Sequence, residues 1–421
     1  MHDRAEKGSA SPVGGTFGSL SDLRVIDLTQ MLAGPFATMM LADHGVTVIK
    51  VEQPAGDITR SFGPYRDDDS ERVLGGYFQS LCRNKESVVL DLKSEPGKAA
   101  FRALVRNADA VVENFRAGVM DRLGLSFESL RAINPRLVYG SLRGFGDPRT
   151  GISPYCEWPA FDVVAQAMGG ITAITGPDPE TPTKVGPGIG DIIPGMFLAF
   201  GVLAAIHNAR RTGRGQFVDV AMTDAILAIC ERVVIQHSVS NLVPGPQGNH
   251  HPYLCPFGFY PAKDGPVAIA ATNDGFFAEL CRGLDAPELL DDDRFATSAL
   301  RGANQSALIP LIGARTARFT KAELKASLGG KIPFGPVMNI AEAVADPHFA
   351  LREMFVAVEQ PGSGEIRVAG VPIKMTETPG AVLRRSPLLG EHTAFRLAEA
   401  GLSAPEIAML TGSAGQGRGQ P

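Results

Sequence analysis

Two aspartates occupy predicted helix starts, and either could take part in chemistry. Asp191 follows the glycine-rich run at residues 186–190 (GPGIG), and Asp162 follows Phe161 in the segment FDVVAQAMGG. An aspartate in this position usually caps backbone N–H groups of the helix. The position also favours the ionised carboxylate, so we expect a low pKa for Asp191 and an ability to attack a carbonyl without a separate base. The flanking glycines would let a bulky substrate approach.

The other reactive side chains form no recognisable catalytic or metal-binding motif. The sequence has no GxSxG elbow, and its five cysteines form no CxxC pair, which favours reduced thiols in a cytoplasmic protein. His250 and His251 are the only close histidine pair, and adjacent residues rarely bind one metal ion, so we expect no metal site. The glycines at 186–190 come late and precede no P-loop lysine, which favours a tight turn over a nucleotide-binding loop.

The overall composition is that of an ordinary globular protein. Of the 421 residues, 40 are Lys or Arg and 45 are Asp or Glu, and the formal net charge is −5. This balance argues against broad binding of nucleic acid or of an anionic membrane surface, but not against a small anion held by a few basic residues. The longest apolar run, residues 196–206, is too short to span a bilayer.

Short apolar strands alternate with helices through the first half of the chain. Residues 23–28 (LRVIDL) predict a strand, a helix follows with Pro35 in its first turn and Gly45 at its end, and residues 46–52 predict the next strand. Such units build parallel sheets. Further strands are predicted at 87–92, 110–114 and 137–142, and helices at 96–107 and 127–133. We therefore expect a doubly wound α/β domain.

A second, smaller domain is predicted beyond a break at residues 244–252 (PGPQGNHHP). Before the break, helices are expected from Asp162, from Asp191 to Thr212 and across residues 224–240. After the break, a strand is expected at 267–271, helices at 275–284, 305–311 and 321–328, a strand-like segment at 363–374, a loop at 386–393 and a final helix.

Several segments together resemble class III CoA-transferases, the formyl-CoA transferase and CaiB/BaiF-like family. The likeness runs in order from about residue 22 to residue 410 and includes NKESVVLDLK (84–93), ADAVVENFRAGVMDRLG (108–124), INPRLVYGSLRGFG (133–146), FDVVAQAMGG (161–170), GDIIPGMFLAFGVLAAIHNARRTGRGQFVDVAM (190–222), GPVMNIAEAVADPHF (335–349) and PLLGEHT (387–393). Several independent motifs make this resemblance more specific than any one glycine pattern.

The resemblance implies an α/β fold in which a Rossmann-like, doubly wound large domain receives an inserted smaller α+β domain. The large CoA-binding domain would begin with residues 20–225, the small domain would span 246–335, and residues 350–421 would form a linker and return to the large domain. Two chains of the family thread through each other as an interlocked homodimer, with the active site between the large domain of one chain and the small domain of the other. The break at 244–252 would fall near a loop that covers this site.

Carried over to matching positions, the family's nucleophile falls on Asp191 and its supporting acidic residue on Asp162. Related racemases carry an acid/base histidine where this chain has Phe161, which favours acyl transfer over racemisation. A family arginine near the CoA phosphates is Gln53 here. The positions implied to contact CoA are Gln30, Met31, Leu90, Lys93, Asn114, Phe115, Arg122 and Arg143.

The implied reaction moves CoA from an acyl-CoA, with succinyl-CoA the closest match, to a small carboxylic acid, which we expect to be a dicarboxylic acid, through an aspartyl-CoA thioester. No permanently bound cofactor is expected, because the CoA thioester is itself a substrate. Backbone N–H groups at the helix start after Asp191 would stabilise oxyanions. Arg60 could bind a distal carboxylate or form a structural ion pair, and Asn249 and His250 could line the same pocket.

Other functions stay open at this point: an acyl-CoA racemase or isomerase, and a non-catalytic CoA-binding protein. A nicotinamide oxidoreductase would need a phosphate-binding loop directly after Leu28, where TQMLAGP lacks the glycine spacing. The expected partners are an acyl-CoA, a free carboxylic acid and a second copy of the chain in the cytoplasm, without nucleic acid or membrane.

Overall fold

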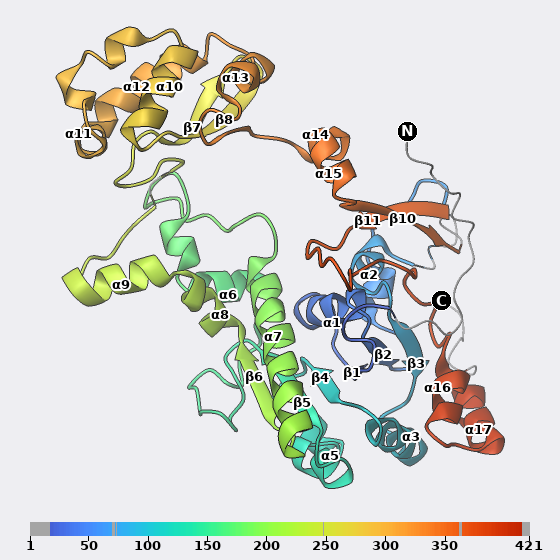
Figure 1. Ribbon diagram of the computed structural model, residues 1–421. Helices are drawn as coiled ribbons and strands as arrows, with labels where there is room; N and C mark the ends of the chain where they lie inside the picture. The colour runs from blue at the N-terminus through green and yellow to red at the C-terminus, as the bar shows by residue number, and fades with distance from the viewer. Residues whose placement is uncertain (1–16, 70–71, 73, 247, 362–363, 415–421) are drawn as a thin grey trace. The chain divides into compact units, whose positions relative to one another are not determined.

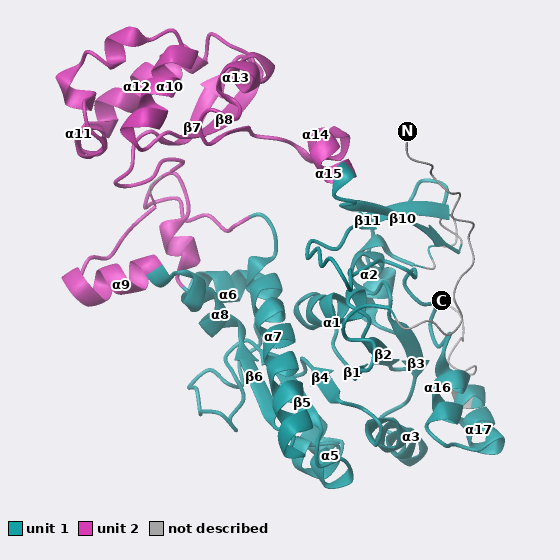
Figure 2. Cartoon of the chain, in the orientation of Figure 1, with its two compact units in different colours: residues 1–169, 186–231, 351–421 teal, residues 170–185, 232–350 magenta. Residues whose placement is uncertain are grey.

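The structure is a computed structural model that describes residues 17–69, 72, 74–246, 248–361 and 364–414. The chain divides into two compact units (Figure 2). Unit 1 comprises residues 1–169, 186–231 and 351–421, and unit 2 comprises residues 170–185 and 232–350. The predicted large segment 20–225 thus contains residues 170–185 that belong to unit 2, and unit 2 is longer than the predicted small domain 246–335. Residues 415–421 of the predicted return segment lie outside the described residues.

A parallel sheet forms the centre of unit 1 (Figure 1). In the described part of the chain it has six strands in the order β3-β2-β1-β4-β5-β6, all pairs parallel. The chain winds outward from β1 in one direction and from β4 in the other, which confirms the predicted doubly wound α/β fold. The strands are β1 (Arg24–Asp27), β2 (Thr47–Glu52), β3 (Glu86–Val89), β4 (Ala110–Glu113), β5 (Val138–Arg143) and β6 (Phe217–Ala221).

Helices pack against this sheet because strands that are buried on both faces need apolar cover. Val25, Ile26, Val48, Ile49 and Val111 are all fully buried. The helices are α1 (Ala33–Asp43), α2 (Gly76–Leu81), α3 (Glu95–Val105), α4 (Val119–Arg122), α5 (Phe127–Ile133), α6 (Asp162–Met168), α7 (Ile189–Thr212), α8 (Met222–Ile229), α16 (Thr393–Glu399) and α17 (Ala404–Ala414), with the 3-10 turn η1 (Ile58–Ser61). An antiparallel hairpin of β10 (Phe355–Gln360) and β11 (Gly364–Ala369) completes the unit.

The longest helix of unit 1, α7, packs against α1, α6, α8, β5 and β6. It is the one described helix whose length and composition would by themselves allow it to cross a membrane. Leu198, Val202, Ala205 and Ile206 are buried in unit 1. These contacts are those of a helix that covers a sheet in a protein core.

The chain's C-terminal segment covers the edge strand β3. The His392 N–H donates to the Ser87 carbonyl oxygen over 2.9 Å, and the Val89 N–H donates to Thr393 Oγ1 over 3.0 Å. Arg396 forms an ion pair with Glu86 in the same strand. Unit 1 is therefore closed by residues that lie about 300 positions further along the chain.

Unit 2 contains an antiparallel sheet packed against helices. Its described strands run in the order β7-β8-β9, at Phe257–Ala262, Gly265–Ala270 and Phe334–Pro336. The core includes Tyr260, Ile269, Phe277, Leu280 and Leu308. The helices are α9 (Glu231–Ser240), which begins at the last residue of unit 1, α10 (Asp274–Gly283), α11 (Ser298–Ala303), α12 (Gln305–Thr316), α13 (Lys321–Leu328), α14 (Ile340–Ala345) and α15 (Pro347–Leu351), with 3-10 turns η2 (Ile171–Ile174), η3 (Pro287–Leu289) and η4 (Asp293–Phe295).

Candidate active site

A cavity of about 350 Å³ lies in unit 1 at the carboxyl ends of β1, β4 and β5. In doubly wound sheets, ligands bind where the strand order reverses, which here is the position between β1 and β4. The turn after β1 contributes Gln30 and Met31 to the wall, and the turn after β4 contributes Asn114 and Phe115. Asp191 lines the same cavity. The structure thus brings the predicted nucleophile together with four of the eight residues predicted to contact CoA, and a fifth follows below.

Two reciprocal hydrogen bonds join the turns on either side of this switch point. Asn114 Nδ2 donates to the Gln30 carbonyl oxygen over 2.7 Å, and the Gln30 N–H donates to Asn114 Oδ1 over 2.9 Å. The next residue, Met31, has a φ of 66°, in the left-handed region that disfavours side chains larger than hydrogen. The surrounding structure therefore holds this turn in a conformation that it would rarely adopt alone.

Asp191 lies in the first turn of α7 and does not cap that helix. The helix begins after Gly188, and no side chain at the cap position bonds to its N–H groups. Instead, Asp162 at the start of α6 accepts a hydrogen bond over 2.8 Å from the Gly190 N–H. Gln166 Nε2 also donates to the Asp162 carboxylate, over 2.9 Å. The capping role that the sequence suggests for either aspartate thus belongs to Asp162, which caps a helix other than its own.

The remaining N–H groups in the first turn of α7 are also engaged. The Ile189 N–H donates to the Pro187 carbonyl oxygen. The N–H groups of Asp191 and Ile192 both donate to the Gly188 carbonyl oxygen. These donors have acceptors within the turn in this structure, and stabilisation of an oxyanion at this helix start stays a prediction.

The predicted low pKa of Asp191 is wrong. Burial, together with the negative charge of Asp162, raises the pKa of Asp191 to about 7. Burial and the charge of Asp191 likewise raise the pKa of the Tyr77 phenol, which places this hydroxyl within electrostatic range of both aspartates. At neutral pH the carboxylate and the carboxylic acid of Asp191 coexist, and the carboxylate is more basic than that of an ordinary aspartate.

The glycines beside Asp191 serve packing within the protein. A Cβ atom at Gly190 would lie 2.5 Å from the Asp162 carbonyl oxygen, and one at Gly188 would lie 2.9 Å from Leu32 Cδ2. These glycines let α6 and the turn after β1 approach the start of α7. The expectation that they leave room for a substrate is therefore wrong at these two positions.

Arg143, at the end of β5, lines the cavity and braces its wall. Its Nε donates to the Phe115 carbonyl oxygen over 2.9 Å, and its Nη2 donates to Glu113 Oε1 over 2.8 Å. It also forms an ion pair with Asp147. The guanidinium is largely buried and bonds to protein acceptors. Its hydrogen bond to the Phe115 carbonyl oxygen therefore positions the backbone of Phe115 in the cavity wall.

The other three residues predicted to contact CoA do not line this cavity. Leu90 is buried in the core between the sheet and α3, and its N–H donates to the Glu52 carbonyl oxygen. Lys93 and Arg122 are exposed on the surface of unit 1. The contacts of Lys93 and Arg122 with CoA stay predictions that concern a part of the ligand outside the cavity.

Arg60 adopts the structural alternative that the sequence left open. Its Nε and Nη2 each donate to Glu52 over 2.7 Å, its Nη1 donates to the Pro387 carbonyl oxygen, and its guanidinium lies 3.9 Å from the Phe78 ring centroid. The Arg60 side chain is almost fully buried, and its nitrogen atoms already donate to protein acceptors. Its guanidinium is therefore not available for bidentate binding of a substrate carboxylate.

Asn249 and His250 belong to unit 2, where they line a separate cavity of about 590 Å³. Burial lowers the pKa of His250, and its ring lies edge-on to that of Tyr260 at 5.2 Å. The pocket also contains Arg232 and Phe259. Their role toward a substrate stays a prediction.

Sequence reasoning missed Trp158, the one tryptophan of the chain. It lines the cavity with Asp191, is 56% exposed, and packs against Tyr155 at a ring distance of 4.8 Å. Its rarity and its place just before Phe161 and Asp162 were the available signals. Within the described residues, no group of three His, Cys, Asp or Glu side chains could hold a metal ion, and all five cysteines are free.

Comparisons with known proteins agree with this architecture. The model of "CoA-transferase family III" matches residues 20–393. The chain is 48% identical to succinyl-CoA:mesaconate CoA-transferase of Haloarcula hispanica, over 91% of this chain and 97% of that one. It is 39% identical to succinate–glutarate CoA-transferase of Agrobacterium fabrum, over 90% and 95%. Its fold is similar to the crystal structure of a CAIB/BAIF family protein from Brucella suis, with a TM-score of 0.81 and 37% identity over 91% of this chain and 100% of that one.

These matches cover both units and confirm the resemblance found in the sequence motifs. The parallel sheet, the cavity at its switch point and the aspartate at the start of α7 all lie within the matched residues. The chain belongs to CoA-transferase family III.

Proposed function

We propose that the protein transfers CoA between succinyl-CoA and a small dicarboxylic acid, with Asp191 carrying CoA as a thioester. The observation that carries the proposal is Asp191 itself, a partly buried carboxylate on the wall of the cavity at the sheet's switch point. The names of the relatives that act on mesaconate and glutarate support succinyl-CoA as donor and a dicarboxylate as acceptor.

The reaction needs four substitutions at carbonyl carbons. The Asp191 carboxylate attacks the donor thioester, and the C–S bond breaks to give a mixed anhydride and CoA thiolate. The thiolate attacks the aspartyl carbonyl of the anhydride, releases the donor acid and leaves aspartyl-CoA. The acceptor carboxylate then attacks this thioester, and the C–S bond breaks to give a second mixed anhydride and CoA thiolate. The thiolate attacks the acceptor carbonyl of that anhydride, which yields the new acyl-CoA and releases the Asp191 carboxylate. No net proton transfer or redox change occurs, so the thioester energy is retained.

The environment of Asp191 favours the first of these steps. Burial and the charge of Asp162 disfavour the negative carboxylate, as its raised pKa shows. Acylation converts this carboxylate into a neutral group and moves the negative charge onto the departing thiolate. The factors that raise the pKa therefore also make the carboxylate a better nucleophile, at the cost of a smaller ionised fraction below neutral pH.

Mass spectrometry tests the covalent step directly. Incubation with succinyl-CoA, without acceptor, should give a protein adduct of CoA on the peptide that contains Asp191. Hydroxylamine should convert that residue to the hydroxamate. The mechanism would be disproved if the protein turns over succinyl-CoA and all of its peptides are detected, but none carries an adduct at Asp191.

A panel of acceptor acids tests the substrate class. With succinyl-CoA as donor, we expect small dicarboxylates such as mesaconate and glutarate to be converted faster than monocarboxylic acids of the same length. Activity with aromatic acids alone would remove the dicarboxylate proposal. Exchange of α-hydrogen for solvent deuterium without any acceptor would instead indicate a racemase.

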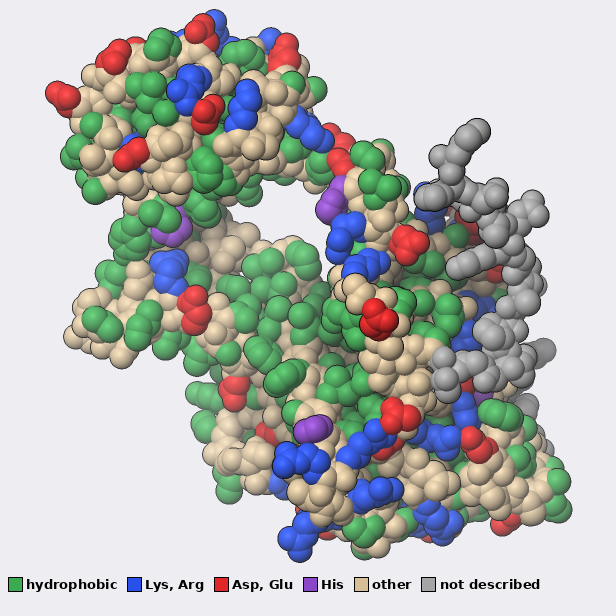
Figure 3. Space-filling view, in the orientation of Figure 1, with side chains coloured by type: hydrophobic (Ala, Val, Ile, Leu, Met, Phe, Trp, Pro, Cys, Tyr) green, Lys and Arg blue, Asp and Glu red, His purple; other side chains and the backbone are tan. Residues whose placement is uncertain are grey.

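We also propose that the active protein is a homodimer. The α7 helix exposes Met196, Phe197 and Phe200, the last 74% exposed. In the space-filling view of the chain, hydrophobic side chains gather in the region of unit 1 around α7 (Figure 3). Apolar surface of this kind supports a contact with a second copy. Light scattering on a size-exclusion column should give twice the mass of the chain, and the mass of a single chain would contradict the proposal.

A further inference from the structure

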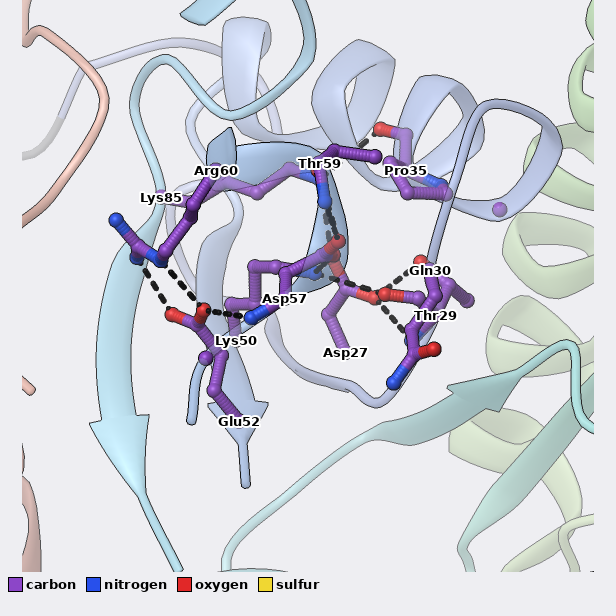
Figure 4. Close-up of polar contacts among 12 residues, drawn as sticks. Asp27, Thr29, Gln30, Pro35, Lys50, Glu52, Asp57, Thr59, Arg60 and Lys85 are labelled. Carbon is purple, nitrogen blue, oxygen red and sulfur yellow. Dashed lines mark hydrogen bonds and ion pairs between the residues drawn. The ribbon is translucent and has the colours of Figure 1, made fainter. Parts of the chain in front are cut away.

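A fully buried cluster of charged residues lies beside the turn that carries Gln30 and Met31 (Figure 4). We call it the charge cluster and define it as Asp27 at the end of β1, Lys50 in β2, Lys85 just before β3, and Asp57 in the loop after β2. All four are at most 4% exposed. Lys50 Nζ lies 2.8 Å from Asp57 Oδ2, and Lys85 Nζ lies 3.0 Å from Asp27 Oδ2.

The two lysines bond directly to the backbone of the turn and of the helix that follows it. Lys50 Nζ donates to the Thr29 carbonyl oxygen over 2.8 Å. Lys85 Nζ donates to the Pro35 carbonyl oxygen over 2.9 Å, in the first turn of α1, and to Thr38 Oγ1 over 2.7 Å. The cluster thus holds the backbone on both sides of Gln30 and Met31.

Asp27 completes the attachment from its own strand. Its Oδ1 accepts the Thr29 N–H over 2.8 Å, and its Oδ2 accepts the Thr38 hydroxyl over 2.7 Å. Burial opposes the ionisation of Asp27, but Lys85 and Lys50, together with the hydrogen bonds from Thr29 and Thr38, hold the pKa of this carboxyl below its usual range. The negative charge that anchors the two lysines is therefore retained at neutral pH.

The far side of the same turn contacts the catalytic elements. Gln30 is bonded in both directions to Asn114, across the switch point. A Cβ atom at Gly188 would touch Leu32, and one at Gly195 would lie 2.5 Å from the Ala33 carbonyl oxygen, so the turn packs closely on α7. The turn is thus held between the charge cluster on one side and the helix that carries Asp191 on the other.

Stability alone is a weak reason for such a cluster. Buried ion pairs are often no more stabilising than well-packed apolar residues of the same size. A lysine ammonium group has three N–H groups that donate hydrogen bonds in defined directions, and an apolar side chain has none. Here these donors reach two carbonyl oxygens that set the path of the backbone around the cavity wall.

We propose that Lys50 and Lys85 are positioning residues for CoA binding, which fix the turn so that Gln30 and Met31 form part of the wall of the cavity that Asp191 also lines. This inference rests on the proposed function, because it takes the ligand of the cavity to be a CoA thioester. A misplaced turn weakens binding of CoA in the ground state and in the transition state alike. It should therefore raise the KM for the CoA substrate more than it lowers kcat.

Kinetics of Lys50→Met and Lys85→Met, with Arg83→Met as the matched control, test the proposal. Arg83 forms an equally buried ion pair with Asp43, at 2.6 Å, but at the opposite end of α1 from the turn. We expect each lysine variant to raise the KM for succinyl-CoA about tenfold or more with kcat changed less than about threefold. Arg83→Met should lower the melting temperature without that change in KM.

A milder variant keeps the test decisive if the lysine variants do not fold. Thr38→Val preserves the side-chain shape and removes only the hydroxyl that links Lys85 to Asp27. We expect it to raise the KM for succinyl-CoA about threefold with kcat unchanged. An unchanged KM in a folded Thr38→Val variant, together with unfolded lysine variants, would show that the cluster is structural only and would overturn the proposal.

Direct binding separates this inference from the proposed function. Titration with desulfo-CoA or CoA, followed by calorimetry and by the fluorescence of Trp158, reports binding without any turnover. If the wild-type protein binds no CoA, the proposed function fails. If the wild type binds and folded lysine variants bind with the same Kd, the positioning role alone is overturned.

Discussion

Asp27 is a fully buried aspartate and Asp191 a partly buried one, both near the carboxyl edge of the same sheet, yet their surroundings are opposite. Asp27 is bonded to Lys85, Thr29 and Thr38, and its pKa lies below the usual range although burial opposes its charge. Asp191 forms no ion pair with any described residue and faces the like charge of Asp162, and its pKa rises to about 7. Both regions belong to unit 1.

The difference shows that the groups around a carboxylate determine whether it anchors the backbone or takes part in covalent chemistry. Cations and hydroxyls around Asp27 make its charge permanent, and a permanent charge can anchor backbone. Burial without cations leaves Asp191 with a charge that is costly to keep. A group whose charge is costly gains most from forming a neutral covalent bond, which is what a carrier of CoA must do.

The largest effect should come from removing the Asp191 carboxylate. We expect Asp191→Asn to lower the rate of CoA transfer by about 10⁴-fold or more, because the nucleophile is lost. Asp219→Asn is a matched control, since burial also raises the pKa of Asp219, which lies on β6 outside the cavity. Steady-state assays with succinyl-CoA measure both. Transfer by Asp191→Asn within tenfold of the wild type would remove Asp191 from the mechanism.

Removing the charge of Asp27 should instead destabilise the fold. Asp27→Asn removes the acidic partner of Lys85, whereas Lys50 keeps its ion pair with Asp57. We expect a loss of about 3–5 kcal/mol in the free energy of unfolding, because the buried Lys85 charge is left uncompensated. Because the folded pKa is depressed, this stabilisation is present above the unfolded pKa and is lost as the pH falls. Urea unfolding at pH 7 measures the loss, and the exposed Asp68→Asn serves as control. A loss no larger than that of the control would mean that Asp27 is not an anchor.

Asp191→Asn should raise the free energy of unfolding, whereas Asp27→Asn lowers it. The raised pKa means that the folded state disfavours the carboxylate, so the wild type loses stability as the pH rises from about 4 toward 7. Asp191→Asn lacks this cost, and its stability advantage should be about 2 kcal/mol greater at pH 8 than at pH 5. Thermal or urea unfolding at the two pH values provides the comparison, and an advantage independent of pH would contradict it.

The smallest expected effect concerns the charge of Asp162. The kcat/KM for succinyl-CoA should rise with pH through about 7, as the Asp191 carboxylate forms. Asp162→Asn removes the like charge but retains an oxygen to accept the Gly190 N–H. We therefore expect the rise to move to lower pH by about one unit. An unmoved profile in a folded variant would show that burial alone raises the pKa of Asp191.

The strands β1–β5, β8 and β11 and the ends of most helices could be predicted because they follow from local apolar patterns, whereas β7, β9 and β10 were not predicted. The runs at β1, β2 and β4 are short, rich in apolar residues and almost entirely buried, as expected for a sheet covered on both faces. The edge strand β6 was missed, because Phe217–Ala221 alternates apolar residues with Asp219 and is only partly buried. Lys50 within an apolar strand was a signal of the charge cluster that was not used.

The chemistry of the site depended on contacts that no local pattern contains. The sequence placed Asp162 and Asp191 at helix starts, but their proximity follows from the packing of α6 against α7. Burial, together with that proximity, reverses the expected pKa of Asp191, and the proximity moves the capping role to Asp162. In the same way, the two alternatives for Arg60 were resolved only by the position of Glu52.

The closure of β3 by residues 384–396 has a consequence during protein synthesis. Strand β3 and the segment that covers it are separated by 305 residues, as the pair Ser87 and His392 shows. At roughly 5–20 residues per second, a ribosome would need on the order of 15–60 s to add the covering segment. For that time the nascent chain would carry an unprotected sheet edge, which is the kind of surface on which chains associate wrongly. A chaperone that holds the emerging chain would therefore matter most before residues 384–396 are made.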